Sequence, residues 1–190
     1  MQFSDSDIRI FYAFANVVKK SNSFDDVTIK TISEEVGISR QAMYQSHYRN
    51  VNEILNAVYY YVDQDIQNQI QNILDNRHSN TDFIDAIEKV VLPLLYEKRE
   101  LLQVVFSENL HSTWISFIEN RYSELLLPLF RDKVYEGTTI PAISQVKSVI
   151  HTFMGLVSIG VRQPVTQNMH DFSATILFAL RNSVEALIEN

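Results

Sequence analysis

The stretch of chain over residues 36–52 combines side chains that can bind a nucleic acid. It contains no Asp or Glu, and its only charged residues are Arg40 and Arg49, within a protein whose net charge is −7. The guanidinium of Arg40 and the amide of Gln41 can each form paired hydrogen bonds with the edge of a base in the major groove of DNA. An acid-free window in an acidic protein is therefore the surface that a polyanion would approach.

Other donors surround this pair of residues. Hydroxyl, imidazole and cationic side chains can bind phosphates, which positions a protein on DNA without reading its sequence. The small side chain of Ala42 permits a close approach to the bases. Tyrosine often buries its ring and exposes its hydroxyl, so Tyr44 and Tyr48 are also candidates for the domain core. The predicted DNA-binding residues are Thr28, Lys30, Ser39, Arg40, Gln41, Ala42, Tyr44, Gln45, His47, Tyr48 and Arg49.

Three helices are expected to position these side chains. Capping residues at positions 4–6 precede an apolar series with helical spacing, which predicts a first helix over residues 5–20. Thr28 is the expected N-cap of a short second helix, which Gly37 ends because glycine adopts a positive φ at little cost. Ser39 is the expected N-cap of the third. This order is typical of a helix-turn-helix domain, in which the third helix enters the major groove.

The composition favours an all-α chain. It has four glycines and four prolines, with no proline before Pro93, whereas the turns of a β-rich protein need many more. The fold prediction is an N-terminal three-helix helix-turn-helix domain over residues 1–50, followed by a helical dimerisation and ligand-binding domain over residues 51–190. Apolar periodicity predicts the first helix of the second domain at about residues 51–74. The next helix is expected to begin at a cap, Thr81 or Asp82, and to end at a kink near Pro93. Further helices are predicted at about 98–108, 112–127, 142–163 and 170–189. Asp63 and Gln67 are expected to lie away from the apolar side of the first of these helices.

The segment TIKTISEEVGISRQAMYQSHYRNVNEILNAV resembles the signature of the TetR family of transcriptional regulators. Its first part matches the family pattern, in order, at Thr28, Ile32, Gly37, Ile38, Ser39, Arg40, Met43 and Tyr44. Its second part matches at His47, Tyr48, Arg49, Asn50, Glu53, Ile54 and Leu55. The resemblance covers about 30 residues. It implies a regulator, usually a repressor, that binds a palindromic operator as a homodimer and is released by a small-molecule effector.

Three positions depart from that pattern. Ser33 replaces the usual alanine and is small enough to keep the helix packing. Val51 occupies a position where the family commonly has a lysine near the DNA backbone. The spacing from Tyr44 to Tyr48 is one residue longer than usual, which predicts a lengthened or reshaped end of the third helix at residues 45–46.

The last two predicted helices carry apolar seams with steps of three and four residues, which suit close helix pairing. The family resemblance implies that these helices pair with their mates across a two-fold axis as a four-helix bundle. The periodicity alone leaves open that both seams are intramolecular core. The residues predicted for the dimer interface are Val146, Ile150, Phe153, Val157, Gly160, Leu177, Leu180, Val184 and Leu187.

Aromatic and imidazole side chains of the second domain are candidates for lining an effector pocket. Such a pocket would suit a small apolar or aromatic molecule, although aromatic residues at helical spacing are more often ordinary core. Three consecutive tyrosines at 59–61 point about 100° apart, so only one or two can face a common cavity. The predicted lining residues are Tyr60, Phe83, Phe106, His111, Trp114, Phe117, His151 and Phe153.

Other function classes find little support in the sequence. There is no cysteine, no pair of histidines with metal-ligand spacing, no glycine-rich phosphate loop and no catalytic serine or carboxylate motif. We therefore expect no enzyme activity, no cofactor and no metal. A secretion signal and an apolar run of about 18 residues are also lacking, which predicts a cytoplasmic protein without a membrane partner.

The main alternative is a protein of the same fold that acts through protein–protein contacts, as an interaction module or coactivator without its own operator. Val51 and the additional residue near Ser46 are the features that favour it. DNA binding that weakens steeply as salt rises would distinguish a DNA-reading protein from this alternative, because phosphate contacts release counterions.

Overall fold

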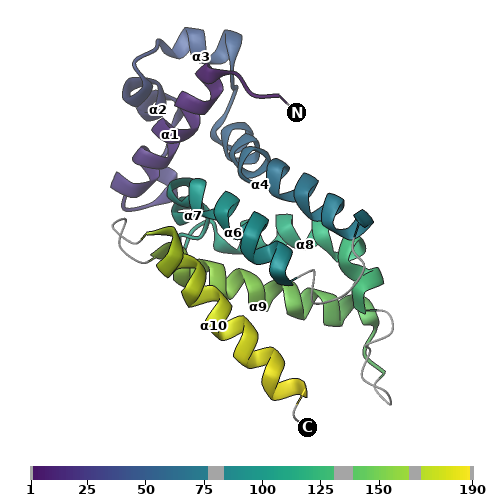
Figure 1. The fold of residues 1–190 in the computed structure, drawn as a ribbon. Coiled ribbons are helices and arrows are strands. Elements are labelled where there is room, and N and C mark those ends of the chain that lie inside the picture. Colours follow the sequence, from purple (N-terminus) through teal and green to yellow (C-terminus); the bar gives the residue numbers. More distant parts are fainter. Residues whose placement is uncertain (1, 77–83, 131–138, 163–167, 189–190) are drawn as a thin grey trace.

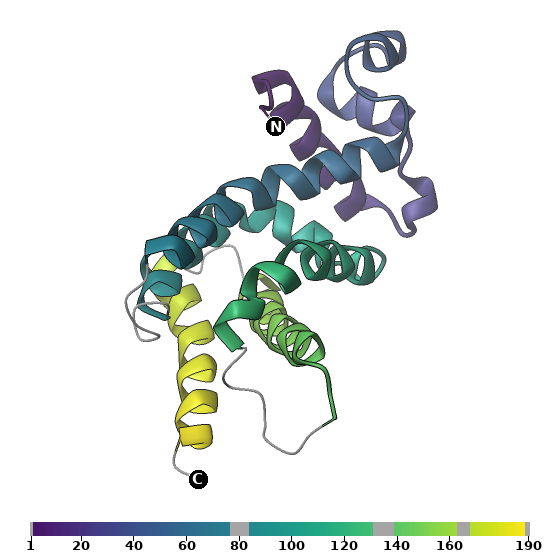
Figure 2. The ribbon, with the colours of Figure 1, turned by 90° about the vertical axis from the view of Figure 1, so that its right-hand side faces the viewer.

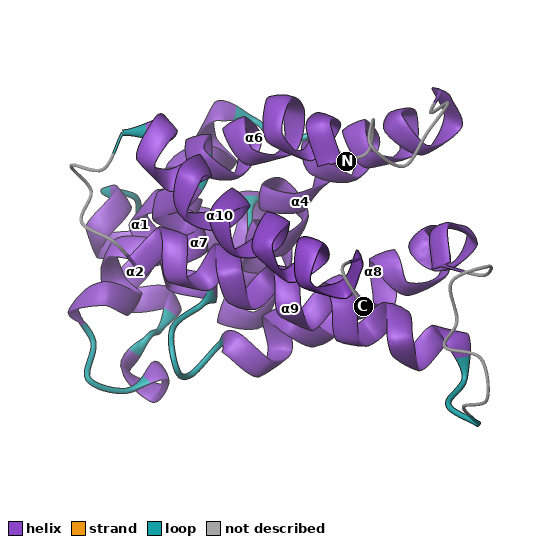
Figure 3. Ribbon diagram, turned by 60° about the horizontal axis from the view of Figure 1, so that its bottom comes forward, coloured by secondary structure: helices purple, strands orange, loops and turns teal. Residues whose placement is uncertain are grey.

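The computed structural model describes residues 2–76, 84–130, 139–162 and 168–188, and it describes their side chains except those of Phe130 and residues 181–188. All the regular elements in these ranges are helices (Figure 3), which confirms the all-α prediction. The expected caps at Thr81 and Asp82 and the predicted pocket residue Phe83 lie outside the described residues.

The N-terminal helices form a group at one end of the molecule (Figure 1). They are α1 (Asp5–Lys20), the 3-10 turn η1 (Phe24–Asp26), α2 (Ile29–Val36) and α3 (Arg40–Ser46). Each of the three α-helices begins after a residue whose side chain accepts a hydrogen bond from the first turn, namely Ser4, Thr28 and Ser39. These caps satisfy backbone N–H groups that have no partner inside the helix. The predicted first three helices are therefore confirmed.

Helix α4 (Val51–Asn76) is the longest element, and it runs from the N-terminal group along the rest of the molecule (Figure 2). The remaining elements are η2 (Ile87–Val91), α6 (Leu92–Glu97), α7 (Arg99–Val105), α8 (His111–Phe130), α9 (Ala142–Arg162) and α10 (Met169–Ile188). Element η2 is a π-helical turn in which the N–H of Leu92 bonds the carbonyl of Ile87. It ends at Val91, two residues before Pro93, where the predicted kink lay. Proline lacks the N–H that continues an α-helical ladder.

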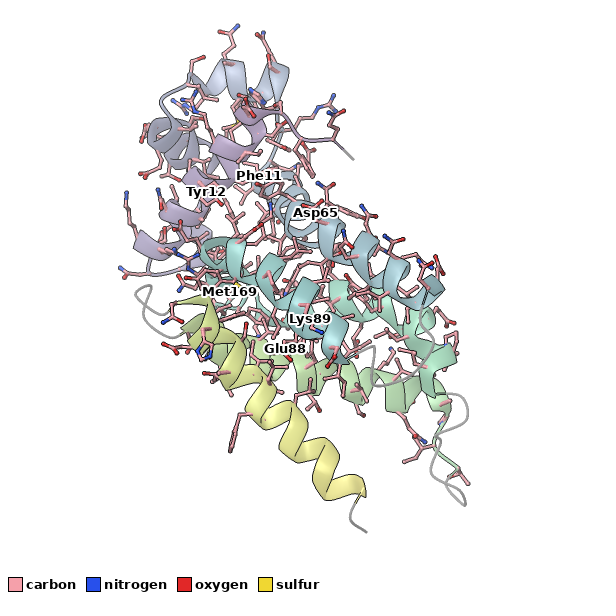
Figure 4. All side chains as sticks on the ribbon, in the orientation of Figure 1. Phe11, Tyr12, Asp65, Glu88, Lys89 and Met169 are labelled. Carbon is pink, nitrogen blue, oxygen red and sulfur yellow. The ribbon has the colours of Figure 1, made fainter. Side chains whose placement is uncertain are left out.

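The helices of the second half pack in sequence order, with α8 on α9 and α9 on α10. Helix α1 packs against α2 and also against α4 and α7, so it connects the N-terminal group to the rest of the core. Phe11 lies on the side of α1 that faces α4 (Figure 4), and its ring centroid is 5.3 Å from that of Tyr61. The predicted division of the chain near residue 50 falls at the start of α4.

Helix α9 has the length and apolar content of a membrane-spanning segment, and it is the one such helix in the described ranges. The core helix of a folded domain has the same properties. One face of α9 is buried against α7, α8 and α10, and it includes Val146, Met154 and Val157. Burial inside this chain therefore accounts for part of the apolar content of α9.

Candidate nucleic-acid interface

The turn between α2 and α3 is fixed by one glycine and one carbonyl. Gly37 has φ 77°, in the left-handed region that side chains other than glycine rarely adopt. The carbonyl of Ser33 accepts hydrogen bonds from the N–H groups of both Gly37 and Ile38, each at 3.0 Å. Ser39 then begins α3, and its hydroxyl accepts the N–H of Ala42 at 3.1 Å.

Buried side chains hold α2 against α1 and α3 against α2. Ile32 and Met43 are fully buried, and Met43 is the residue of α3 that enters the core. Ser33 is also buried, and its hydroxyl donates to the carbonyl of Ile29 at 2.6 Å. A satisfied hydroxyl costs little in the interior, so this structure accommodates serine where the family pattern has alanine.

The opposite side of α3 faces solvent. Arg40, Gln41, Tyr44 and Gln45 are exposed, and the Tyr44 side chain is 51% accessible, while Ala42 is half-buried. Most of the other predicted DNA-binding residues are exposed as well: Thr28, Lys30, Ser39 and Arg49. The structure therefore brings one guanidinium, two amides and one phenol together on a single short helix.

His47 and Tyr48 are placed differently from the rest of the predicted set. Both are half-buried, and both contact Asp7 at the start of α1. The Tyr48 hydroxyl donates to Oδ1 of Asp7 at 3.1 Å, and Nδ1 of His47 lies 3.4 Å from the same oxygen. The Tyr48 ring packs near that of Phe11, with centroids 6.2 Å apart. Tyr44 is therefore the surface tyrosine of the pair, and Tyr48 belongs to the edge of the core.

The Asp7 contacts also change the acidity of the groups involved. Partial burial by itself raises the pKa of Asp7, but hydrogen bonds from Ser4, Tyr48 and His47 outweigh it and hold the pKa below its usual range. Burial, followed by the neighbouring Asp7 charge, raises the pKa of the Tyr48 hydroxyl. Tyr48 therefore remains a hydrogen-bond donor to an ionised carboxylate.

The additional residue between Tyr44 and Tyr48 is absorbed at the C-terminal end of α3. The carbonyl of Met43 accepts hydrogen bonds from the N–H groups of both His47, at 3.0 Å, and Tyr48, at 2.9 Å. The bond to Tyr48 spans five residues and closes a wider turn than an α-helix does. Helix α3 stays regular through Ser46, so the change in shape lies just after the predicted residues 45–46.

The start of α4 has no cation at position 51. Val51 is half-buried and packs against the core. Asn50 caps the helix instead: its Oδ1 accepts the N–H of Glu53 at 2.9 Å, and the carboxylate of Glu53 accepts the N–H of Arg49 at 2.8 Å. The exposed Arg49 side chain is thus the cation nearest in sequence to this helix start.

The whole fold is similar to solved structures of bacterial repressors. NalD of Pseudomonas aeruginosa, the secondary repressor of the MexAB-OprM multidrug efflux pump, matches with a TM-score of 0.62 and 15% identity, over 93% of this chain and 96% of that one. FadR of Thermus thermophilus, a TetR-family transcriptional repressor solved in complex with lauroyl-CoA, matches with a TM-score of 0.56 and 14% identity, over 92% and 91%. The chain has the fold of TetR-family repressors. No family model and no curated protein sequence matches it.

In this TetR fold, the predicted pocket residues divide into two groups. Phe106, His111, Trp114 and Phe117 lie together where α7 meets α8, and the rings of Trp114 and Phe117 stack with centroids 5.5 Å apart. Trp114 is 1% exposed, so these side chains fill the space between them. Phe106 and Trp114 are buried in the core, whereas His111 and Phe117 are half-buried at its edge.

The other predicted pocket residues lie outside this aromatic cluster. Tyr59, rather than Tyr60, is its member from α4, with a ring centroid 5.1 Å from that of Trp114 and its hydroxyl 2.7 Å from Oγ1 of Thr113. Tyr60 is exposed and packs edge-on against Phe117. Exposed His151 contacts Glu119 of α8 at 2.8 Å, and Phe153 is half-buried on α9. A surface depression of about 600 Å³ lies beside Tyr60, with mostly polar lining from Gln64, Asp65, Gln67, Asn68 and Arg121.

The predicted dimer seams face the inside of the same chain. Val146, Ile150, Val157, Gly160 and Leu177 are buried, and Phe153 and Leu180 are half-buried. A Cβ atom on Gly160 would lie 3.0 Å from the ring of Phe172, so this glycine permits the approach of α10 within the chain. The five buried residues pack inside this chain, which is the alternative that the periodicity left open, and the dimer interface itself stays a prediction. The side chains of Val184 and Leu187 lie outside those described.

A buried polar network, which the sequence did not predict, joins α4 and α8. Asp63, expected on the polar side of α4, is 1% exposed. Its carboxylate accepts hydrogen bonds from the Tyr122 hydroxyl at 2.7 Å and from Nε of Arg121. A second nitrogen of the same guanidinium, Nη2, donates to Oε1 of Gln67. Burial raises the pKa of Asp63 more than these donors lower it. These contacts join residues that are 54 to 59 positions apart in the chain, so helical periodicity could not have predicted them.

Proposed function

We propose that this protein is a DNA-binding transcriptional regulator, a repressor that binds a palindromic operator as a homodimer. The observation that carries the proposal is the exposed side of α3, where Arg40, Gln41, Tyr44 and Gln45 face solvent on a helix anchored by Met43. The surrounding window has no acid and two arginines. The TetR fold supports the same proposal, since both solved neighbours are repressors.

The exposed residues divide into two roles in this proposal. Arg40 and Gln41, on the first turn of α3, read base edges in the major groove through paired hydrogen bonds. Thr28, Ser39, Tyr44 and Arg49 bind phosphates and so position the domain. Lys30 also binds phosphates in this proposal. Its ion pair with Glu34 is 4.0 Å long and exposed to solvent, and such a pair contributes little and leaves the ammonium available.

The dimer interface is proposed on the outward faces of α9 and α10. These faces keep large apolar side chains exposed after the chain has folded, including Val149, Ile159 and Phe178. We propose that these side chains contribute to a protein–protein contact. Dimerisation would present two copies of α3 about one turn of DNA apart, roughly 34–36 Å, as a palindromic operator requires.

The proposed effector is a small apolar or aromatic molecule that enters the aromatic cluster at the α7–α8 junction. Because the rings of this cluster fill the available space, binding requires one of them to rotate away. Such a ligand would change operator affinity only if it prefers one arrangement of the helices over another. A shift of the thermal midpoint with candidate aromatic compounds, lost in Trp114→Ala, would identify this site.

Selection of bound sequences from a pool of random DNA tests the central proposal. We expect the wild-type chain to recover a palindrome, with an affinity that falls steeply as salt rises. Arg40→Ala should lower the affinity for the recovered duplex by about tenfold or more and relax the preference at one base position. Arg9→Ala, which removes an exposed cation from α1, is the matched control. If no sequence is enriched, the protein–protein alternative is favoured and the DNA proposal is wrong.

A further inference from the structure

The carboxylate of Asp7 contacts two helices that are distant in the sequence. Its Oδ2 accepts the N–H of Ser4 at 3.0 Å and the Ser4 hydroxyl at 2.7 Å, which completes the cap of α1. Its Oδ1 accepts the Tyr48 hydroxyl at 3.1 Å and lies 3.4 Å from Nδ1 of His47. One side chain therefore connects the first turn of α1 to the two residues that follow α3.

Neighbouring contacts fix the same two residues. Oγ of Ser6 lies 3.3 Å from Nε2 of His47, so the imidazole has a partner on α1 for each of its nitrogens. The N–H groups of both His47 and Tyr48 bond the carbonyl of Met43. A change in the position of His47 or Tyr48 would therefore be transmitted directly to the last turn of α3.

Helix α3 depends on contacts at its two ends. It has seven residues, and a helix of two turns has little stability of its own in water. The turn at Gly37 and Ser39 fixes its N-terminal end, and Met43 anchors its middle in the core. The contacts of His47 and Tyr48 with Asp7 and Ser6 are the polar contacts that fix its C-terminal end.

We propose that Asp7 is a positioning residue for DNA binding: it sets the orientation of α3 through Tyr48 and His47 and does not itself touch DNA. This inference rests on the proposed function. It assigns Tyr48 and His47 to the support of α3, whereas the sequence predicted both as DNA-binding residues, with Tyr48 also a candidate for the core. Arg40 and Gln41 depend on this support, because paired hydrogen bonds to a base edge tolerate little change in helix angle.

Because Asp7 is charged, the two possible roles of this side chain predict opposite changes in DNA affinity when the charge is removed. A carboxylate that merely lay near DNA would repel phosphates, so Asp7→Asn would strengthen binding. A positioning carboxylate has the opposite effect, and its loss weakens binding to the specific sequence. Phosphate contacts are sequence-independent, so a duplex of random sequence and equal length should be bound almost as well as before.

The test is a double-mutant cycle with Asp7→Ala and Tyr48→Phe, measured by fluorescence anisotropy on the duplex recovered from the random pool. We expect each single variant to lower affinity by about tenfold, and Tyr48→Phe to have little further effect in the Asp7→Ala background. Ser4→Ala is the matched control, because it removes the hydroxyl that caps α1 and donates to Oδ2 but leaves the N–H of residue 4 on Oδ2 and both contacts of Oδ1 in place. It should lower the thermal midpoint without lowering the affinity.

Several results would overturn the inference. If Tyr48→Phe weakens binding equally in both backgrounds, Tyr48 contacts DNA directly. If Asp7→Asn strengthens binding, Asp7 is only a surface charge. If Asp7→Ala does not fold, Asp7→Asn takes its place in the cycle. If both single variants bind the duplex as tightly as the wild type, the role of Asp7 is wrong and the proposed function is unaffected. If the wild-type chain enriches no sequence, the proposed function itself is wrong.

Discussion

Two aspartates join helices in this molecule, and their surroundings are opposite in kind. Asp7 lies at the rim of the N-terminal group and connects α1 to the end of α3. Its carboxylate oxygens have three partners within 3.4 Å, which are Ser4, His47 and Tyr48. Asp63 is buried between α4 and α8 and is bound by Arg121 and Tyr122. Burial raises the pKa of both carboxyls, but the hydrogen bonds together outweigh it at Asp7 and not at Asp63, so the two shifts have opposite directions.

This difference separates a contact that positions a surface from one that the core requires. Removing a donor at the rim leaves a group that water can reach and solvate. Removing a donor in the interior leaves a buried charge without a partner, because water cannot reach and solvate it. We therefore expect the Asp63 network to control the stability of the chain, and the Asp7 contacts to control the geometry of α3 at a smaller cost in stability.

The largest effect is expected from Arg121→Met. This change keeps the apolar part of the side chain but leaves the buried Asp63 carboxylate without its cation, which should lower the free energy of unfolding by about 3–5 kcal/mol. Urea denaturation followed by circular dichroism measures it. Lys89→Met is the control, because its pair with Asp85 is exposed and should contribute less than about 1 kcal/mol. Equal losses in the two variants would show that the Asp63 network is not special.

The two tyrosines that donate to these aspartates give a smaller and more direct comparison. Tyr122→Phe removes the donor to buried Asp63 and should cost about 1.5–3 kcal/mol, as hydrogen bonds to charged groups do. Tyr48→Phe removes the donor to Asp7 at the rim and should cost about 0.5–1.5 kcal/mol. Both substitutions keep the ring, so the difference in unfolding free energy reports the environment of the carboxylate. The reverse order would contradict the assignment of Asp63 to the core.

The smallest effect is a pH dependence of stability with opposite signs at the two sites. The folded-state pKa of Asp7 is lowered, so its contribution is present above the usual Asp value of 3.8 and is lost as pH falls through the folded value. The folded-state pKa of Asp63 is raised, so stability declines as pH rises from 3.8 through the folded value.

Thermal unfolding of wild type, Asp7→Asn and Asp63→Asn over a series of pH values checks both signs. The deficit of Asp7→Asn relative to wild type should shrink in acid, where the wild-type carboxylate also becomes neutral. The deficit of Asp63→Asn should shrink as pH rises above 3.8, because the wild type then carries the cost of a buried charge. Parallel curves for either variant would show that its aspartate does not titrate differently in the folded and unfolded states.

The sequence by itself determined the elements of the N-terminal group. Ser4, Thr28 and Ser39 begin the three helices, and Gly37 ends the second, as their positions predicted. Each of these signals acts over three or four residues of the chain, so it is present in the local sequence before any packing occurs. The all-α class followed for the same reason, from the scarcity of turn residues.

Only the tertiary structure decided which faces of those helices meet. It directed Tyr48 and His47 toward Asp7, about 40 positions earlier in the chain. It buried Asp63 with Tyr122 and turned the apolar seam of α9 toward α10, where Gly160 meets Phe172. Periodicity identifies a face but not its partner, because the partner depends on the angles at which distant helices pack.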